Sequence, residues 1–289
     1  MNEPIPDTTL VALINLLDEP DESAYRMVRE RIISLGPAAL QPLQRSLENT
    51  FDGIVRDRIR CILRKLYRDS LFSEFSDWLE NGSSDLLKGF MLVTKTKYPS
   101  LDEANIMMRL EQIRMDIWIE LNDNLTPLET IRVMNHLLFD IHRFEGNADE
   151  LKSSESNFIN NLLDSRKGSP LSMGILYLIL ARKLGLPVYG VDLAHHFVLA
   201  YMSAPDIGEP EREDVLFYLN PLSSGTVFTG REIDTFLKHA QLKPEKSHYL
   251  PCSNIAIIRR LITSLVFACR QEGDTENIED LETLLSALE

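Results

Sequence analysis

The chain has 289 residues, which is enough for two packed units or for one domain with a helical extension. Hydrophobic residues make up 44% and charged residues 26% of it, as in ordinary globular proteins, and no apolar run approaches the roughly 18 residues of a membrane span. The formal net charge of −14 argues against nonspecific binding to nucleic acid or to an anionic membrane, since both need a positive surface. We therefore expect neither nucleic acid nor a membrane as a partner.

The N-terminal segment and the cysteines indicate the compartment. The segment MNEPIPDTTL has neither the basic start nor the apolar stretch of a secretory signal. Three cysteines, Cys61, Cys252 and Cys269, cannot all pair with one another, and no two have metal-ligand spacing. We expect a cytoplasmic protein whose cysteines are buried thiols, with no metal and no cofactor.

Residues 8–80 are expected to form successive helices. The first helix has one apolar face, formed by Leu10, Leu13, Ile14 and Leu17. Pro20 ends it, and Asp21 can cap the next helix. A short helix followed by a longer one then recurs after Gly36, which predicts a pair of HEAT-like repeats over residues 1–80, or a helical cap on the following domain.

Basic side chains gather within residues 56–68 of this region: Arg56, Arg58, Arg60, Arg64, Lys65 and Arg68. On one helix they would form either a solvated face or a surface for an acidic partner or for the acidic remainder of the chain. A basic, concave N-terminal surface would favour a helical-repeat adaptor, which we keep as one alternative function.

The segment NGSSD, residues 81–85, is a Gly-Ser stretch between periodic segments and predicts the domain boundary. The pattern over residues 86–156 is helical again, with breaks at KYPSLDE and NDNLTPLE. Both breaks have capping-box spacing, at Ser100 and at Thr126, so we expect each to begin a helix of a helical lead-in.

After a helix that begins near Pro170, the pattern changes. Short runs rich in Val, Tyr and Phe predict three strands: PVYGVDL, HFVLAYM and VLFYLNP. The expected fold class is α+β and mainly helical, with a small antiparallel sheet packed on a central helix and a helical N-terminal region. The core is expected at residues 157–237 and C-terminal helices at 238–289, which with the lead-in complete a domain over 86–289.

The stretch SRKGSPLSMGILYLILARKLGLPVYGVDLAHHFVLAY, residues 165–201, combines a capped helix start with a histidine pair at the head of a strand. A thiol-protease-like site needs a nucleophile at a helix N-terminus, where N–H groups and the helix dipole stabilise a thiolate. It also needs a histidine to move the proton and a third side chain to orient that histidine. His195 or His196 begins one strand and Asn220 ends the next, so candidates for two of the three roles are present.

The helix followed by LGLPVYGV, HHFVLAY and LNP resembles the transglutaminase-like cysteine-protease superfamily. The run NFINNLLDSRKGSPLSMGILYLILARKLGLPVYGV is similar to its bacterial Sir-B-type branch. The resemblance is dense over residues 157–225, weaker over 86–156 and absent from 1–80. In the parent superfamily the helix opens with Gly-x-Cys, and counting back from the turn at Gly185 places that cysteine at Pro170. The resemblance therefore implies a site without its sulfur.

The resemblance leaves two alignments for the histidine. His195 matches the catalytic histidine when the strands are aligned on Tyr201, whereas alignment on the branch's own His-Phe pair selects His196. Asn220 matches the acidic third member, and asparagine can orient a histidine in thiol proteases. We predict that one of the two histidines is hydrogen-bonded to Asn220 across adjacent strands.

Ser169 and Ser172 are the remaining candidate nucleophiles. Ser169 is better suited to cap the helix, with Pro170 in its first turn. Ser172 lies two residues beyond Pro170, which rotates its side chain by roughly 200° at ~3.6 residues per turn and points it away from the site. The histidine pair has no third ligand in metal spacing, so we expect one buried, hydrogen-bonded ring and one exposed ring.

The leading hypothesis is a non-catalytic transglutaminase-like protein that binds a protein or peptide, with Pro170 in place of the nucleophilic cysteine. One alternative is a hydrolase or transferase that uses His195 or His196 and Asn220 with a water or serine nucleophile. The other is the helical-repeat adaptor. A closed polar pocket that joins a histidine to Asn220 would favour the enzyme.

Overall fold

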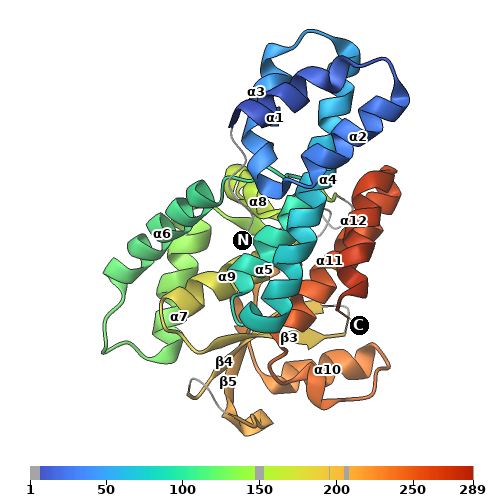
Figure 1. Ribbon diagram of the computed structural model, residues 1–289. Helices are drawn as coiled ribbons and strands as arrows, with labels where there is room; N and C mark the ends of the chain where they lie inside the picture. The colour runs from blue at the N-terminus through green and yellow to red at the C-terminus, as the bar shows by residue number, and fades with distance from the viewer. Residues whose placement is uncertain (1–6, 147–152, 195, 205–207, 289) are drawn as a thin grey trace. The chain divides into compact units, whose positions relative to one another are not determined.

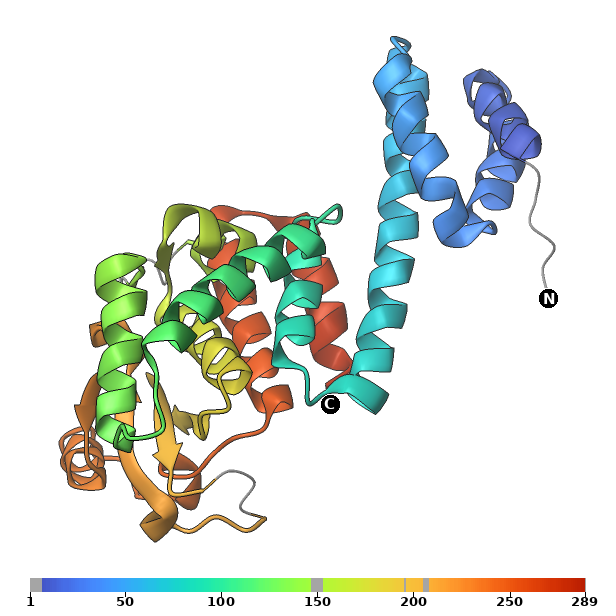
Figure 2. The same cartoon turned by 90° about the vertical axis from the view of Figure 1, so that its left-hand side faces the viewer.

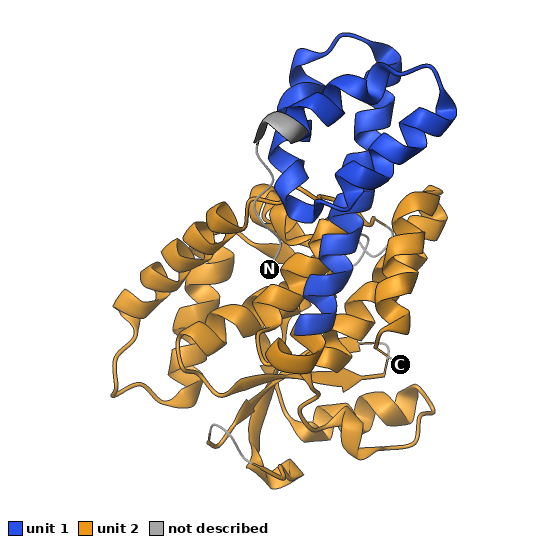
Figure 3. Cartoon of the chain, viewed as in Figure 1, with its two compact units in different colours: residues 1–77 blue, residues 78–289 orange. Residues whose placement is uncertain are grey.

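The structure is a computed structural model, and it describes residues 7–146, 153–194, 196–204 and 208–288. The chain divides into two compact units, residues 1–77 and 78–289 (Figure 3). The segment 81–85 lies just inside the second unit, because helical backbone continues through the π-helix η3 (Trp78–Gly82). The indole of Trp78 is buried in the second unit and donates a hydrogen bond to the carbonyl oxygen of Asp85 at 2.8 Å.

The described residues of the first unit are helical. Its elements are α1 (Asp7–Asn15), η1 (Leu16–Asp18), α2 (Glu22–Ile33), η2 (Gly36–Ala39), α3 (Leu40–Asn49) and α4 (Gly53–Asp77). Asp21 caps α2 as predicted, since its carboxylate accepts a hydrogen bond from the backbone N–H of Ser23 at 3.0 Å. The helices share a core of fully buried side chains that includes Leu17, Ile32, Leu43, Ile59 and Ile62. The predicted helices are confirmed, and the HEAT-like character of their pairing stays a prediction.

Two of the basic residues on α4 are used inside this unit. Nη1 of Arg58 donates to the carbonyl oxygens of Leu17 at 2.9 Å and of Glu19 at 2.7 Å. Arg56 donates in the same way to two carbonyl oxygens at the C-terminal end of α3, at 3.0 Å each. Carbonyl groups at helix ends lack intrahelical donors, and both guanidinium groups supply the missing hydrogen bonds within the fold. These two residues therefore contact the chain itself, and an acidic partner for the basic face stays a prediction.

The second unit contains the remaining helices. They are α5 (Leu86–Lys95), α6 (Glu103–Glu120), α7 (Pro127–Asn135), η4 (His136–Ile141), η6 (Glu155–Asn157), α8 (Ile159–Ser165), α9 (Pro170–Lys183), η7 (Arg212–Asp214), η8 (Pro221–Ser223), α10 (Gly230–His239), η9 (Lys246–His248), α11 (Asn254–Glu272) and α12 (Thr275–Ser286). The capping box predicted at Thr126 is confirmed, with reciprocal hydrogen bonds to Glu129 at 2.9 and 3.3 Å. The one predicted at Ser100 is wrong, because the carboxylate of Asp102 caps α6 by accepting from the N–H of Asn105 at 2.9 Å. A carboxylate is as good an N-cap as a hydroxyl and also interacts favourably with the helix dipole.

Within the described residues the sheet has four antiparallel strands in the order β3-β4-β5-β6. They are β3 (Val188–Leu193), β4 (His196–Met202), β5 (Val215–Asn220) and β6 (Thr226–Phe228), and a separate parallel pair is formed by β1 (Glu145–Gly146) and β2 (Lys167–Gly168). The three predicted strands are confirmed as β3, β4 and β5. The register pairs Val191 with Val198 and Leu199 with Leu219.

Alternation along β4 gives the sheet two apolar faces. Phe197 lies on the face toward α9, where a Cβ on Gly174 would come within 2.6 Å of its ring. Val198 lies on the opposite face, in a cluster with Ile233 and Leu237 of α10. Residues 171–181 of α9 are all buried, because the sheet, α5, α6, α8 and α11 surround that helix (Figure 1, Figure 2).

These contacts confirm the expected class, an α+β fold with a small antiparallel sheet on a central helix. Within the described ranges, no helix combines the length and the apolar character that crossing a bilayer requires.

Candidate functional site

The central helix α9 begins at Pro170, as the count from the Gly185 turn predicts. Ser169 is the N-cap, and its Oγ accepts a hydrogen bond from the backbone N–H of Ser172 at 3.1 Å. Pro170 occupies the first turn, where its missing N–H would have had no intrahelical acceptor. Because proline carries neither sulfur nor hydroxyl, the position that the resemblance assigns to the nucleophile belongs to the helix cap.

Both candidate serines are held in a buried hydrogen-bond network. The hydroxyl of Ser169 donates to Oδ1 of Asn157 at 2.7 Å, and that of Ser172 donates to the carbonyl oxygen of Ser156 at 2.7 Å. The two hydroxyl oxygens are 3.2 Å apart, and none of the four residues exceeds 4% exposure. That Ser172 points away from the site at Pro170 stays a prediction, and its hydroxyl lies beside that of the N-cap. Three residues rotate a side chain by about 300°, which brings Ser172 back beside the N-cap.

Asn220 and His196 do not form the predicted hydrogen bond. The side chain of Asn220 caps η8: its Oδ1 accepts from the N–H of Leu222 at 3.1 Å, and its Nδ2 donates to Oγ of Ser223 at 3.2 Å. The exposed ring of His196 meets Phe236 edge to face, with centroids 5.0 Å apart. The turn after β5 therefore uses both polar groups of Asn220. His195, the other candidate, lies outside the described residues.

Replacing Asn220 by alanine should lower the free energy of unfolding by about 1 kcal/mol, because the N–H of Leu222 loses its acceptor in a partly exposed turn. Urea unfolding followed by tryptophan fluorescence measures this loss. Asn220→Asp keeps the acceptor oxygen and should retain most of the stability. An unchanged midpoint in the alanine variant would mean that the cap contributes nothing.

Asn135 of α7 fixes the turn after Asn220 to the central helix. Its Nδ2 donates to the carbonyl oxygen of Gly225 at 2.9 Å, and its Oδ1 accepts from the hydroxyl of Tyr177 on α9 at 2.9 Å. Tyr177 is fully buried, and burial raises the pKa of its hydroxyl, so the group stays protonated and donates. Sequence reasoning missed this bridge, since Asn135 stands 90 residues before Gly225 in no recognisable motif.

The cysteines lie elsewhere than at the start of α9. Cys269 is buried on α11 beside the amide of Asn277, and Cys252 lies just before α11. Cys61 is exposed on α4 and Cys252 is only partly buried, so the prediction that all three thiols are buried is confirmed only for Cys269. Among the residues that the structure describes, no three His, Cys, Asp or Glu side chains gather in a group that could hold a metal ion.

Alkylation should distinguish these thiols. Burial raises the pKa of Cys252 to about 11, so at pH 8 its thiolate fraction is about 200-fold below that of an ordinary thiol of pKa ~8.5. We expect iodoacetamide to modify Cys61 first and Cys252 at a rate that rises about tenfold per pH unit up to its pKa. Mass spectrometry of the digested protein measures both rates. Equal rates at the two positions would contradict the expectation.

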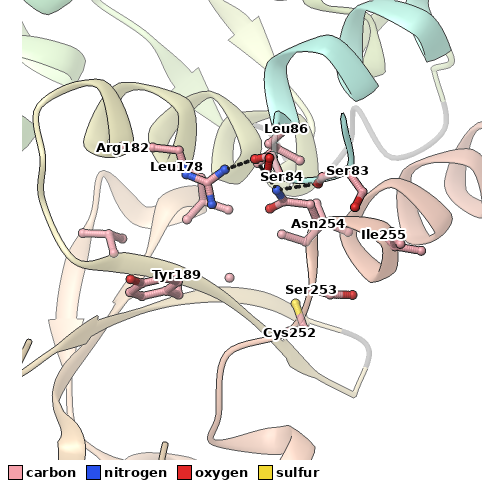
Figure 4. A pocket seen from close by; sticks show the side chains of 13 residues that line it. Ser83, Ser84, Leu86, Leu178, Arg182, Tyr189, Cys252, Ser253, Asn254 and Ile255 are labelled. Atoms are coloured by element: carbon pink, nitrogen blue, oxygen red, sulfur yellow. Dashed lines mark hydrogen bonds between the residues drawn. The ribbon is translucent and has the colours of Figure 1, made fainter. Parts of the chain in front are cut away.

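A pocket of about 350 Å³ lies at the opposite end of α9 from Pro170 (Figure 4). Its apolar lining includes Leu86, Leu178, Val188 and Ile257. Its polar lining includes Arg182, Tyr189, Cys252, Ser253 and Asn254. Arg182 of α9 and Asn254 of α11 both donate to the carbonyl oxygen of Ser84, Asn254 from 2.8 Å. The lining includes neither His196 nor Asn220, so this pocket does not join the histidine and asparagine candidates.

Comparison with known proteins identifies the family of the core. The sequence profile of the transglutaminase-like superfamily, core 2, matches residues 104–263, which contain α9 and the whole sheet. F-box only protein 21 of Homo sapiens is 25% identical over 168 residues, or 54% of this chain and 24% of that protein. A UPF0162 protein of Xylella fastidiosa is 31% identical over 116 residues, 39% of this chain and 41% of the relative.

A UPF0162 protein of Vibrio cholerae is 25% identical over 193 residues, which cover 65% of this chain and 67% of the relative. The chain thus spans about a quarter of F-box only protein 21 and about two fifths of the Xylella fastidiosa protein. No solved structure matches the chain.

Proposed function

Because this chain belongs to the transglutaminase-like superfamily, we propose that it uses the superfamily's core to bind a protein or peptide and performs no thiol chemistry. The observation that carries the proposal is the start of α9, where Pro170 stands in the position that the family resemblance assigns to the nucleophilic cysteine. We place the protein in the cytoplasm, since its three cysteines are free thiols.

The buried serine network supports the same proposal. A serine nucleophile needs a general base within hydrogen-bond reach, yet the hydroxyls of Ser169 and Ser172 donate to Asn157 and to a backbone carbonyl oxygen. Freeing either hydroxyl would leave a buried acceptor without its donor, at a cost of about 1–3 kcal/mol. Asn220, the residue expected to orient a histidine, is occupied by its own turn. Among the described residues, which do not include His195, no general base is hydrogen-bonded to either serine hydroxyl or to Asn220, and this supports binding over the hydrolase or transferase alternative.

An activity test on the full chain separates binding from catalysis. Transamidation of dimethylcasein with dansylcadaverine and hydrolysis of p-nitrophenyl acetate should not exceed the buffer rate, and a fluorophosphonate probe should label neither Ser169 nor Ser172. Selection from a phage-displayed peptide library should enrich a class of peptides that also binds in solution. Turnover that Ser169→Ala or Asn220→Ala abolishes without lowering the melting temperature would overturn the proposal, as would a library without enrichment.

A further inference from the structure

We propose that the pocket at the C-terminal end of α9 binds a carboxylate attached to an apolar group, with the C-terminus of a peptide as the source that fits a binding domain. This inference names a ligand class for the function proposed above and rests on it. It follows from three features that meet in one cavity: the positive charge of Arg182, the N-terminal end of α11 and apolar walls.

The charge comes from Arg182. Among the described residues no carboxylate lies within ion-pair distance of its guanidinium, although the chain carries a net charge of −14. Nη1 donates to the carbonyl oxygen of Ser84, and the side chain extends along one edge of the pocket (Figure 4). A guanidinium has five N–H donors in a planar fork that matches a carboxylate, so one bond to a carbonyl leaves donors for a ligand.

The second feature is the N-terminal end of α11, a helix of 19 residues. Oγ of Ser253 accepts from the N–H of Ala256 at 3.2 Å, whereas the N–H groups of Asn254 and Ile255 have no acceptor within the helix. Both of these residues line the pocket. First-turn N–H groups and the helix dipole favour an anion.

A shared acceptor holds these two positive features together. The amide of Asn254 donates to the carbonyl oxygens of Ser83 at 2.9 Å and of Ser84 at 2.8 Å, and Arg182 donates to the same oxygen of Ser84. The guanidinium and the helix end therefore meet at one side of the cavity, so a single carboxylate can approach both.

The apolar walls of the pocket indicate that the group attached to the carboxylate is apolar. Leu86, Leu178, Val188 and Ile257 line the cavity and are themselves 2–6% exposed. The volume of about 350 Å³ falls within the roughly 300–1,000 Å³ of small-ligand sites. A bare anion such as phosphate would use the positive end and leave these walls unused. A leucine-like side chain next to a carboxylate uses both.

A titration of the ¹⁵N-labelled full chain tests the ligand class. The probes are N-acetyl-Ala-Ala-Leu, its C-terminal amide and 4-methylpentanoate. We expect the peptide acid to shift the amide signals of Asn254 and Ile255 saturably and the peptide amide to bind at least tenfold more weakly. Tighter binding of the peptide acid than of 4-methylpentanoate identifies a peptide C-terminus as the source, and equal binding identifies a free small acid. No saturable shift with either acid, or equal binding of the amide, overturns the inference.

Two variants test the residues. Arg182→Gln should weaken the binding of N-acetyl-Ala-Ala-Leu at least tenfold, while Arg270→Gln, in an exposed ion pair at the other end of α11, should leave it unchanged. Because Arg182 also donates to Ser84, Ile255→Asp serves as a second variant. A carboxylate in the first turn favours the helix but repels the ligand, so this variant should keep its melting temperature and lose the binding.

Unchanged affinity in both pocket variants would overturn the inference. Library peptides that bind the full chain while neither acid enters this pocket would leave the proposed function standing and remove only this inference. Catalytic turnover, by contrast, would remove the proposed function whatever the titration shows.

Discussion

Replacing Gly225 by alanine should lower the free energy of unfolding of the second unit by about 3 kcal/mol or more. The residue has a φ of +69°, in the left-handed region where a Cβ costs roughly 1–2 kcal/mol. A Cβ there would also lie 2.2 Å from Oδ1 and 2.5 Å from Nδ2 of Asn135, so that side chain has to move. Its movement breaks the hydrogen bond from Tyr177 and leaves a buried hydroxyl without an acceptor.

Gly185→Ala is the matched control. Gly185 has a φ of +72°, and no atom lies within 4 Å of a Cβ built there, so only the backbone strain of roughly 1–2 kcal/mol should appear. Both tryptophans, Trp78 and Trp118, belong to the second unit, so their fluorescence during urea unfolding reports its transition. Equal losses of stability in the two variants would show that the Asn135 side chain can move without destabilising the protein and that it does not fix the turn.

The strands were predictable because their signals are local. Apolar and aromatic residues alternate over a few positions between Gly, Pro, Asp and Asn, and β3, β4 and β5 begin and end within one residue of the predicted runs. The three-residue strand β6 was missed, since Thr226–Phe228 is too short for a pattern to stand out. The parallel pair β1 and β2 has two residues per strand and leaves no pattern at all.

The candidate site was predictable only where it depends on neighbours in sequence. The cap formed by Ser169 and Pro170 is a local motif, and the structure places it as expected. The sequence allowed two kinds of hydrogen-bond partner for the Asn220 side chain, a histidine on the adjacent strand or a backbone group of its own turn. Asn followed by Pro at a strand end is typical of turns capped by the asparagine side chain, and that signal would have favoured the local bond.

The pocket had no signal of this kind. Its lining comes from three segments far apart in the chain: the loop before α5, the end of α9 with the start of β3, and the start of α11. Arg182 looks like an ordinary cation in the last turn of a helix, and Asn254 like an ordinary first residue of the next. Only the packing of α11 beside α9 brings the two to the same carbonyl oxygen.

Replacing Ser169 by alanine should lower the free energy of unfolding by about 2–4 kcal/mol. The loss has two parts, because the hydroxyl accepts from the first turn of α9 and donates to the fully buried Oδ1 of Asn157. Loss of an N-cap hydroxyl alone costs about 1 kcal/mol, and a buried acceptor without its donor adds about 1–3 kcal/mol.

Ser253→Ala isolates the first part, since Ser253 is an exposed N-cap whose Oγ accepts from the N–H of Ala256 at 3.2 Å and should cost only about 1 kcal/mol. Adding Asn157→Ala to Ser169→Ala removes the orphaned acceptor, so the double variant should lose less stability than the sum of the losses in the two single variants. Urea unfolding of Ser169→Ala, Asn157→Ala, the double variant and Ser253→Ala measures these losses. If Ser169→Ala and Ser253→Ala cost the same, Asn157 does not hold the Ser169 hydroxyl, and a serine nucleophile at the start of α9 becomes the better hypothesis.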